Sequence, residues 1–457
     1  MPNSQIPPEI WLRIAGYLSK EELLRMLGLN RVFFHLAMDE QYRELSLFEL
    51  GSPELLTHLG SPFVAPRIRL LRIQATPTHD LAYSPQLLED FFCLLLHLQE
   101  CHIVWYDLPL LHDPVMPRLL QTAISTSSSL RTLSLVMSLE KMAALLNPNL
   151  HLPSLEVLDL SICYESPHSA SDPSVIMERC IAPFVHRTSD TLTSFAFETS
   201  HPMDYSPFFA TLRLPCLRAL SLSIPGVAPY LGDYRSIKSF FDQHSGQLEE
   251  LTLRGTYTEG AGAEPGTLSE QNEPSSQKSW VQACFKGAAG NRNLRSLNIQ
   301  TSFLPLEVIG TSIQRFSSRL LTTLVVTGRH LSFALLETTL SSGFESLEKL
   351  KLGTVTLSPE LVDLIAGNTP NLQELDIQIR HVVSSRHIVP MYASKRMRRM
   401  KCQVREQIDD FIIGMRNRRY DSWAHLRRVG VWKFALKMRL EKEYVKVLQE
   451  CLPSLRH

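Results

Sequence analysis

The sequence has no apolar run long enough to cross a membrane. Its longest uninterrupted apolar stretch, around Phe91–Leu98, holds about eight residues and includes His97, whereas a spanning helix needs about 20. The first residues, MPNSQIPPE, lack the basic region and apolar run of a secretory signal. We therefore expect a cytoplasmic or nuclear protein without membrane contact.

The sequence contains cysteines, but they do not occur in closely spaced pairs. The eight cysteines are scattered and none forms a CxxC pair. This spacing argues against a zinc site and against a disulfide framework. We expect reduced thiols, most of them in the core, and no bound metal.

Familiar catalytic motifs are absent as well. The sequence has no GxSxG elbow, no GxxxxGK[ST] phosphate loop, no HExxH helix and no GxGxxG after a strand. Its sixteen histidines are dispersed without ligand spacing. Because an enzyme needs a convergent set of reactive groups, we expect a non-catalytic protein without a cofactor.

The charge balance is neutral overall but uneven along the chain. Apolar residues make up 44% and charged residues 20% of 457 residues, which is ordinary for a folded protein. Residues 386–446 hold 17 Lys or Arg against 6 Asp or Glu, while residues 1–385 hold 28 against 39. This asymmetry indicates that the C-terminal part faces something acidic, either a partner or the rest of the chain.

An internal repeat dominates the rest of the sequence. The pattern apolar-x-x-apolar-x-apolar recurs from Tyr42 to Leu426, and eleven of its thirteen intervals fall between 25 and 32 residues. The clearest copies begin at Leu130, Leu155, Leu248, Leu294, Leu347 and Leu372. That period suits one strand plus one helix.

Each repeat predicts a short strand preceded by a helix. The last two apolar positions of the motif are two apart, so an extended chain points both to one side. Helical apolar spacing occurs upstream, at Leu87–Leu96, Met116–Ile124, Val175–Val185, Ile237–Phe241, Val308–Phe316 and Glu360–Ile365. No unit covers its own apolar face, so the units must stack, strands beside strands and helices outside.

This pattern resembles leucine-rich repeats, from about residue 42 to the end. The resemblance implies an α/β solenoid with parallel strands on the concave side and helices on the convex side. Asn or Cys, frequent in that family three residues past the strand, occurs once, as Cys163. An ordinary α/β domain with a leucine-rich parallel sheet is the alternative. Gly, Glu, Ser and Pro at about residues 255–279 predict a flexible acidic insertion.

The N-terminal segment predicts three short helices. Pro7 and Pro8 suit a helix start, Ser19 followed by Glu22 forms a capping box for a second helix, and the break at Asn30-Arg31 precedes a third. So small a core leaves large apolar groups uncovered, so we expect this module to have a partner.

This segment resembles an F-box in Ile6-Pro7-Pro8-Glu9-Ile10, Tyr17-Leu18, Glu22-Leu23-Leu24 and Leu29-Asn30-Arg31-x-Phe33. It departs from the family at Gly28. The resemblance implies binding to the Skp-type adaptor of a cullin-RING (SCF) ubiquitin ligase, and through it to a cullin. The implied contact residues are Pro7, Pro8, Ile10, Leu12, Ile14, Leu18, Leu23 and Leu24. Some of these, especially Ile14, and also Leu27, could instead hold the three helices together.

A basic stretch near residue 400 suggests a client-binding surface. Met397, Met400 and Cys402 fill the apolar slots of a repeat strand, which would place Arg399 and Lys401 on the concave face. They would lie with Lys349, Lys351, Arg428 and Trp432. One interpretation is a charged ridge of mutual salt bridges around Glu374 and Asp376. The other is a basic patch for an acidic or phosphorylated segment.

We therefore expect two parts: an adaptor-binding F-box module at 1–47 and an irregular leucine-rich-repeat solenoid at 48–457. The predicted function is substrate recognition for a ubiquitin ligase, with an unidentified client protein. A repeat scaffold without a ubiquitin role and a basic nucleic-acid-binding solenoid are the alternatives, the latter thinly supported by Trp423 and Trp432.

Overall fold

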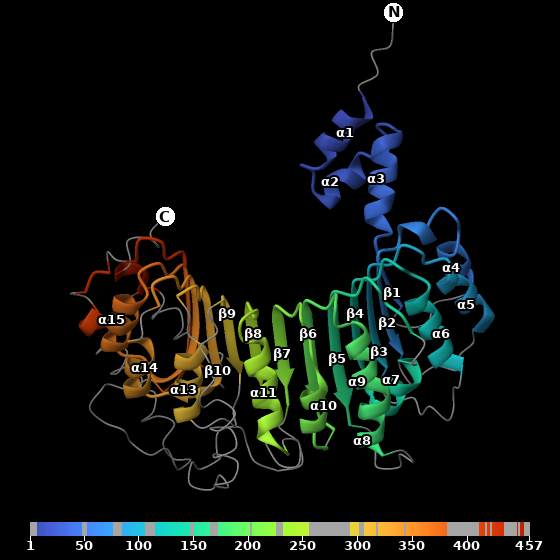
Figure 1. Ribbon diagram of the computed structural model, residues 1–457. Coiled ribbons are helices and arrows are strands. Elements are labelled where there is room, and N and C mark those ends of the chain that lie inside the picture. The colour runs from blue at the N-terminus through green and yellow to red at the C-terminus, as the bar shows by residue number, and fades with distance from the viewer. Residues whose placement is uncertain are drawn as a thin grey trace, which may run out of the picture. The chain divides into compact units, whose positions relative to one another are not determined.

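The computed structural model describes most of the chain. The described residues are 7–47, 53–75, 85–105, 115–146, 150–164, 172–201, 203–224, 232–255, 293–300, 306–316, 319–341, 344–381, 411–415, 418–420, 423–433, 446 and 448–451. They fall into two compact units, residues 1–203 with 211–216 and residues 204–210 with 217–457. Each unit is an α/β leucine-rich-repeat-like solenoid, as the repeat period predicts (Figure 1).

The three N-terminal helices begin where their local signals predict. They are α1 (Pro8–Ala15), α2 (Lys20–Arg25) and α3 (Arg31–Gln41). Ser19 caps α2, since its hydroxyl accepts from the Glu22 amide at 3.3 Å and the Glu22 carboxylate accepts from the Ser19 amide at 2.8 Å. The Asn30 side chain accepts from the Phe33 amide at 3.0 Å and caps α3. The capping box is confirmed, because a cap uses only neighbours in sequence.

The strands of both units pair in parallel and in chain order. In the first unit they are β1 (Glu44–Leu47), β2 (Leu70–Ala75), β3 (Glu100–Trp105), β4 (Thr132–Ser138), β5 (Val157–Cys163) and β6 (Ser194–Thr199). In the second they are β7 (Ala219–Ser223), β8 (Glu250–Arg254), β9 (Ser296–Gln300), β10 (Thr323–Leu331), β11 (Lys349–Thr356), β12 (Glu374–His381) and β13 (Arg428–Lys433). Although β1 lies within the predicted 1–47 module, it already pairs with β2 as part of the sheet.

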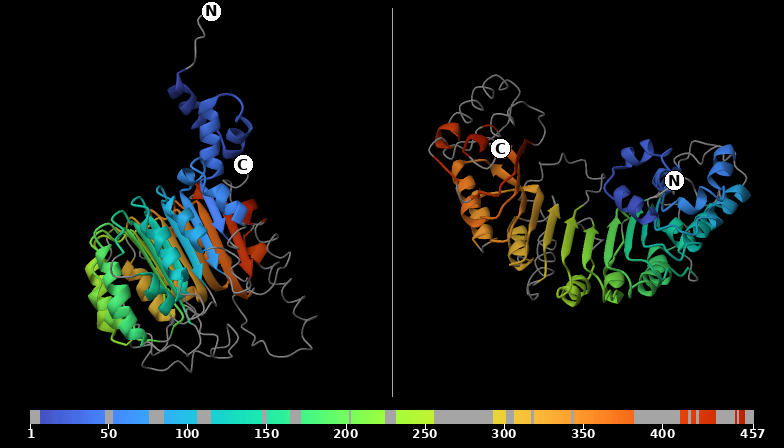
Figure 2. Two further views of the ribbon diagram at one scale, coloured as in Figure 1. Left: turned by 90° about the vertical axis from the view of Figure 1, so that its right-hand side faces the viewer. Right: turned by 90° about the horizontal axis from the view of Figure 1, so that it is seen from above.

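The helices run along one side of each sheet (Figure 2). In the first unit they are α4 (Pro53–Leu59), the 3-10 turn η1 (Ala65–Arg67), α5 (Pro85–Cys93), α6 (Val115–Ser125), α7 (Leu139–Leu145), α8 (Pro173–Ile176), a π-helical segment (Met177–Ile181) and α9 (Ala182–Arg187). The others are α10 (Ser206–Thr211), α11 (Tyr234–His244), α13 (Leu306–Phe316), α14 (Phe333–Leu340) and α15 (Pro359–Asn368). We call the opposite side of each sheet the open face.

All six helical stretches predicted from spacing are confirmed, while others were missed. Helices α7 and α14 were not predicted from spacing, and they follow β4 and β10 with at most one residue between. From β2 to β12 the second and third apolar positions of each motif are buried, for example Leu158 and Leu160 of β5, and their neighbours on the open face are half-buried or exposed in most cases. The core therefore lies between sheet and helices.

Hydroxyl and amide side chains hold the turns that precede the strands. The Ser127 hydroxyl donates to the Leu98 carbonyl at 2.7 Å, and the Thr191 hydroxyl donates to the Leu155 carbonyl at 2.7 Å. The Asn371 amide donates to the Glu345 carbonyl, also at 2.7 Å. These bonds join successive turns, so neighbouring repeats are tied together without the Asn or Cys ladder that the sequence lacks.

The predicted strand at Met397 is wrong as placed. Strand β12 pairs directly with β13, with Glu374 opposite Arg428 and Gln378 opposite Trp432. A strand from residues 397–402 therefore cannot lie between them. The next repeat is built on Trp423 and Leu426, both fully buried, and residues 397–402 themselves lie outside the described residues. Residues 256–279 of the predicted insertion lie outside the described residues.

The expectation of buried cysteines is also wrong for most of those described. Cys101 is buried, and burial raises the pKa of its thiol to about 12. Cys93 and Cys216 are exposed, and the other three described cysteines are half-buried. In the described ranges no helix is long and apolar enough to span a bilayer, and no cluster of His, Cys, Asp and Glu is suited to a metal.

His244 makes the stability of the second unit depend on pH. It is buried at the end of α11, with its Nδ1 2.7 Å from the Phe240 carbonyl oxygen. Burial lowers its pKa below the ordinary value of 6.5, partly opposed by that hydrogen bond. Because the folded state favours the neutral ring, this contribution is fully present above that value and is lost as the pH falls below it.

We expect the free energy of unfolding to fall between about pH 7.5 and about pH 5.5, and to fall less in His244→Leu. Urea denaturation at the two pH values measures both. His201, whose pKa burial also lowers, acts in the same direction and retains its share in that variant. An unchanged pH dependence in His244→Leu would contradict the assignment.

Candidate functional site

The N-terminal helices carry a surface of exposed apolar side chains. Within them the buried residues are Ala15, Phe33 and Ala37, with the Trp11 ring packed edge-on to Phe33 at 5.6 Å between centroids. The N-terminal apolar face consists of side chains exposed by 40 to 82%: Ile10, Leu12, Ile14, Tyr17 and Leu29. So small a core leaves this face uncovered by the described residues of the chain.

None of the eight residues predicted to bind the adaptor is buried. Pro7, Pro8, Ile10, Leu12 and Ile14 are exposed, and Leu18, Leu23 and Leu24 are half-buried. Their side chains are therefore accessible in whole or in part. Tyr17 and Leu29 are exposed as well and were not among the predicted contact residues, although both stand in the motif that carries the F-box resemblance.

No sequence pattern predicted the contact between α3 and the first repeat. The Arg67 guanidinium approaches the Asp39 carboxylate at 2.8 Å and the His35 ring at 3.1 Å. The guanidinium lies 4.0 Å from the centroid of the Phe63 ring, and the ring centroids of Phe63 and Phe34 are 6.0 Å apart. These groups join the helices to residues 58–67, and no sequence pattern marks them because they lie far apart along the chain.

The open face at β11–β13 carries alternating charges. Lys349, Glu374 and Arg428 stand in one register row, and Lys349 Nζ is 2.8 Å from Glu374 Oε2. The hydrogen bond from Lys349, together with the charges of Lys349 and Arg428, holds the pKa of Glu374 below its ordinary value.

The next row places Lys351 beside Asp376, with Gly430 opposite. The predicted client-binding residues Lys349, Lys351 and Arg428 are thus interleaved with acids. This arrangement resembles the charged ridge that was the alternative to a purely basic patch.

The remaining predicted client-binding residues have different positions. Arg399 and Lys401 lie outside the described residues, and the direct pairing of β12 with β13 excludes them from the row between these strands. Trp432 lies on β13 in register with Gln378.

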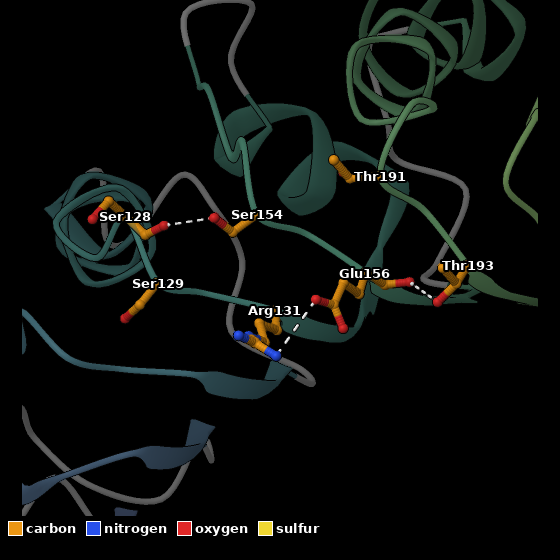
Figure 3. A pocket seen from close by; sticks show the side chains of 7 residues that line it. All are labelled: Ser128, Ser129, Arg131, Ser154, Glu156, Thr191 and Thr193. Carbon is orange, nitrogen blue, oxygen red and sulfur yellow. Dashed lines mark hydrogen bonds and ion pairs between the residues drawn. The ribbon is translucent and has the colours of Figure 1, made fainter.

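A shallow pocket of about 520 Å³ lies at the start of β4–β6 in the first unit (Figure 3). Its lining is polar: Ser128, Ser129, Arg131, Ser154, Glu156, Thr191 and Thr193. Ser154 donates to the Ser128 carbonyl at 3.0 Å, and Thr193 donates to the Glu156 carbonyl at 3.1 Å. Arg131 lies 3.6 Å from the Glu156 carboxylate. The polar groups that line the pocket thus bond to one another. We therefore interpret the pocket as a gap between turns whose side chains are small.

Comparison with known proteins gives distant likenesses of fold. No protein-family model and no curated protein sequence matches the chain. The crystal structure of the yeast Rad7 and Elc1 complex is similar over 85% of this chain and 91% of its own, with 11% identity and a TM-score of 0.37. The leucine-rich-repeat protein LegL7 of Legionella pneumophila is similar over 82% and 98%, with 12% identity and a TM-score of 0.33. The fold assignment rests on the chain's own strand pairings.

Proposed function

We propose that this protein is a non-catalytic substrate-recognition subunit of a cullin-RING (SCF) ubiquitin ligase. Its N-terminal helices bind the Skp-type adaptor, and the open face of the repeats binds the client protein. The observation that carries the proposal is the N-terminal apolar face, which coincides with the segment that resembles an F-box.

The size of the N-terminal module supports a protein partner for that face. Three helices with three buried residues bury too little apolar surface for independent stability. Several large apolar side chains exposed within so short a segment are typical of protein interfaces. A helical cap that only closed the solenoid would turn its apolar residues toward the first repeat. In this protein Ile10, Leu12 and Tyr17 are exposed instead.

The repeats support the second half of the proposal. Stacked parallel strands present a wide, fixed array of side chains, which suits recognition of a protein surface or segment. The half-buried side chains on the open face are mostly polar and come from every strand.

Co-purification with the Skp-type adaptor tests the proposal. We expect the full chain to retain the adaptor through gel filtration, and the double variant Pro8→Ala with Leu18→Ala to lose it. Retention of the adaptor by neither protein would favour a repeat scaffold without a ubiquitin role. Binding of the full chain to generic RNA, with a steep dependence on salt, would instead favour the nucleic-acid alternative.

A further inference from the structure

Strand β10 carries a wide bulge on the side of β11. Val326 pairs with Leu352, but the next pair joins Leu331 to Thr354. The four residues Thr327–His330 therefore stand opposite Gly353 alone. Gly328 has φ 90°, a left-handed conformation that a residue with a side chain rarely adopts. Bulges of this kind re-aim side chains and are enriched beside functional sites.

The bulge crosses the open face of β11. Leu350 and Leu352 are buried in the core, so Lys351 and Gly353 point to the open face. A Cβ atom built on Gly353 would collide with the carbonyl oxygen of Arg329. The Arg329 backbone thus lies over Gly353, and glycine at this position is required for the close approach. Arg329 and His330 themselves are half-buried.

The floor beside the bulge is unusually enclosed for an open face. Asn298, Val325, Lys351 and Asp376 form one register row across β9–β12. Val325 is 9% exposed, although it points away from the core side of β10. The Oδ1 atom of Asn298 is buried and accepts no hydrogen bond within the described residues. A buried carbonyl oxygen of this kind is suited to accept from a peptide N–H.

The charge around this floor favours an anionic occupant. The bulge and the rows beside it bring together Arg329, Lys349, Lys351 and Arg428, against the two acids Glu374 and Asp376. Lys349 forms an ion pair with Glu374, and the charges of Lys349 and Arg428 both lower the pKa of Glu374. The positive balance that remains attracts carboxylates, while the amide acceptor suits a polypeptide rather than a free anion.

We propose that the β10 bulge and the floor beside it, Asn298, Val325 and Lys351, form a docking site for an extended Asp/Glu-rich segment of a protein client. The inference deepens the proposed function, since the occupant is the client of the recognition subunit. Lys351 and Arg329 pair with the segment's carboxylates, and Asn298 accepts from its backbone.

Fluorescence anisotropy with the full chain and a short labelled peptide tests the site. The peptide carries alternating Asp and Glu, and a second peptide carries Asn and Gln at the same positions. We expect saturable binding of the acidic peptide alone. Lys351→Glu and Arg329→Glu should each weaken it by about tenfold or more. The matched control Arg72→Glu reverses an exposed charge on the open face of β2, in the first unit, and should weaken it by less than about threefold.

A deletion variant distinguishes the contribution of the bulge's backbone conformation from that of surface charge. Removing residues 328–330 would restore an uninterrupted register between β10 and β11, and we expect it to abolish binding of the acidic peptide while the parallel sheet is retained by circular dichroism. If the deletion variant does not fold, Lys351→Glu and Arg329→Glu still test the docking site.

Equal binding of both peptides, equal loss in Arg72→Glu, or binding confined to a phosphoserine peptide or to single-stranded RNA would overturn the inference. None of these outcomes depends on the adaptor. Peptide binding without adaptor binding leaves the docking site intact and removes the ubiquitin role, and the reverse result removes the docking site alone.

Discussion

Leu12→Asp is expected to lower the affinity for the Skp-type adaptor by about a hundredfold or more. Leu12, one of the side chains of the N-terminal apolar face, lies on α1 and is 51% exposed. A partner that covers this face would bury the leucine completely. The aspartate loses that burial and brings an unpaired charge into an apolar contact. Truncating a buried interface residue by itself costs about 2–4 kcal/mol of binding free energy. Isothermal titration calorimetry with purified adaptor measures the change.

Leu96→Asp is the matched control for this prediction. Leu96 is 56% exposed and follows α5 in the repeats, outside the N-terminal helices. The same substitution there should leave the adaptor affinity unchanged. Both variants replace a surface residue, so both should keep the unfolding temperature of the parent. Equal losses of affinity in the two variants would show that the adaptor does not bind to the N-terminal apolar face.

Trp423→Ala is expected to cost about 3–5 kcal/mol of unfolding free energy in the second unit. Trp423 is fully buried, and its indole N–H donates to the Thr369 carbonyl, just after α15, at 2.9 Å. Its ring lies 5.6 Å from that of Tyr420, whose hydroxyl donates to the Asp363 carboxylate of α15 at 2.7 Å. Removing the indole opens a cavity and leaves the carbonyl without this donor. Urea denaturation followed by far-ultraviolet circular dichroism measures the loss.

Two further substitutions distinguish packing from the hydrogen bond. Trp423→Phe keeps much of the ring volume and loses the N–H, so it should cost less than Trp423→Ala, about 1–3 kcal/mol. His425→Ala changes an exposed residue in the same segment and should fall within about 0.5 kcal/mol of the parent. A cost below about 1 kcal/mol for Trp423→Ala would mean that this segment does not anchor β13.

The features that follow from neighbouring residues were predicted accurately. The starts of α1 and α2 follow from Pro7, Pro8, Ser19 and Glu22, because caps and proline act within one turn. The strands from β1 to β12 begin two residues after the first apolar residue of their motifs, because each motif fixes which side chains face the core.

The failures occurred where distant residues compete. The motif at Met397 predicted a strand next to β12, but β13 lies directly beside β12. Tyr420 hydrogen-bonds to Asp363 of α15, and Trp423 hydrogen-bonds to the carbonyl that follows α15. An apolar motif gives the capacity for a strand, and the partner that buries it decides whether that strand joins the sheet.

The β10 bulge illustrates the same division. The sequence shows a glycine at 328 and another at 353, and neither alone predicts that one backbone crosses over the other. The contact between Arg67, Asp39 and His35 is likewise formed by groups with no shared motif.

By itself, then, the sequence determined the helix–strand alternation, the parallel stacking and the exposed apolar helices at the N-terminus. Period, capping and composition are local, and short-range sterics and burial act on them directly. Tertiary structure decided which repeat follows β12, which acids lie among the bases of the open face, and where the bulge crosses it. These depend on contacts between residues far apart in the chain, whose free energies arise only once the repeats have stacked.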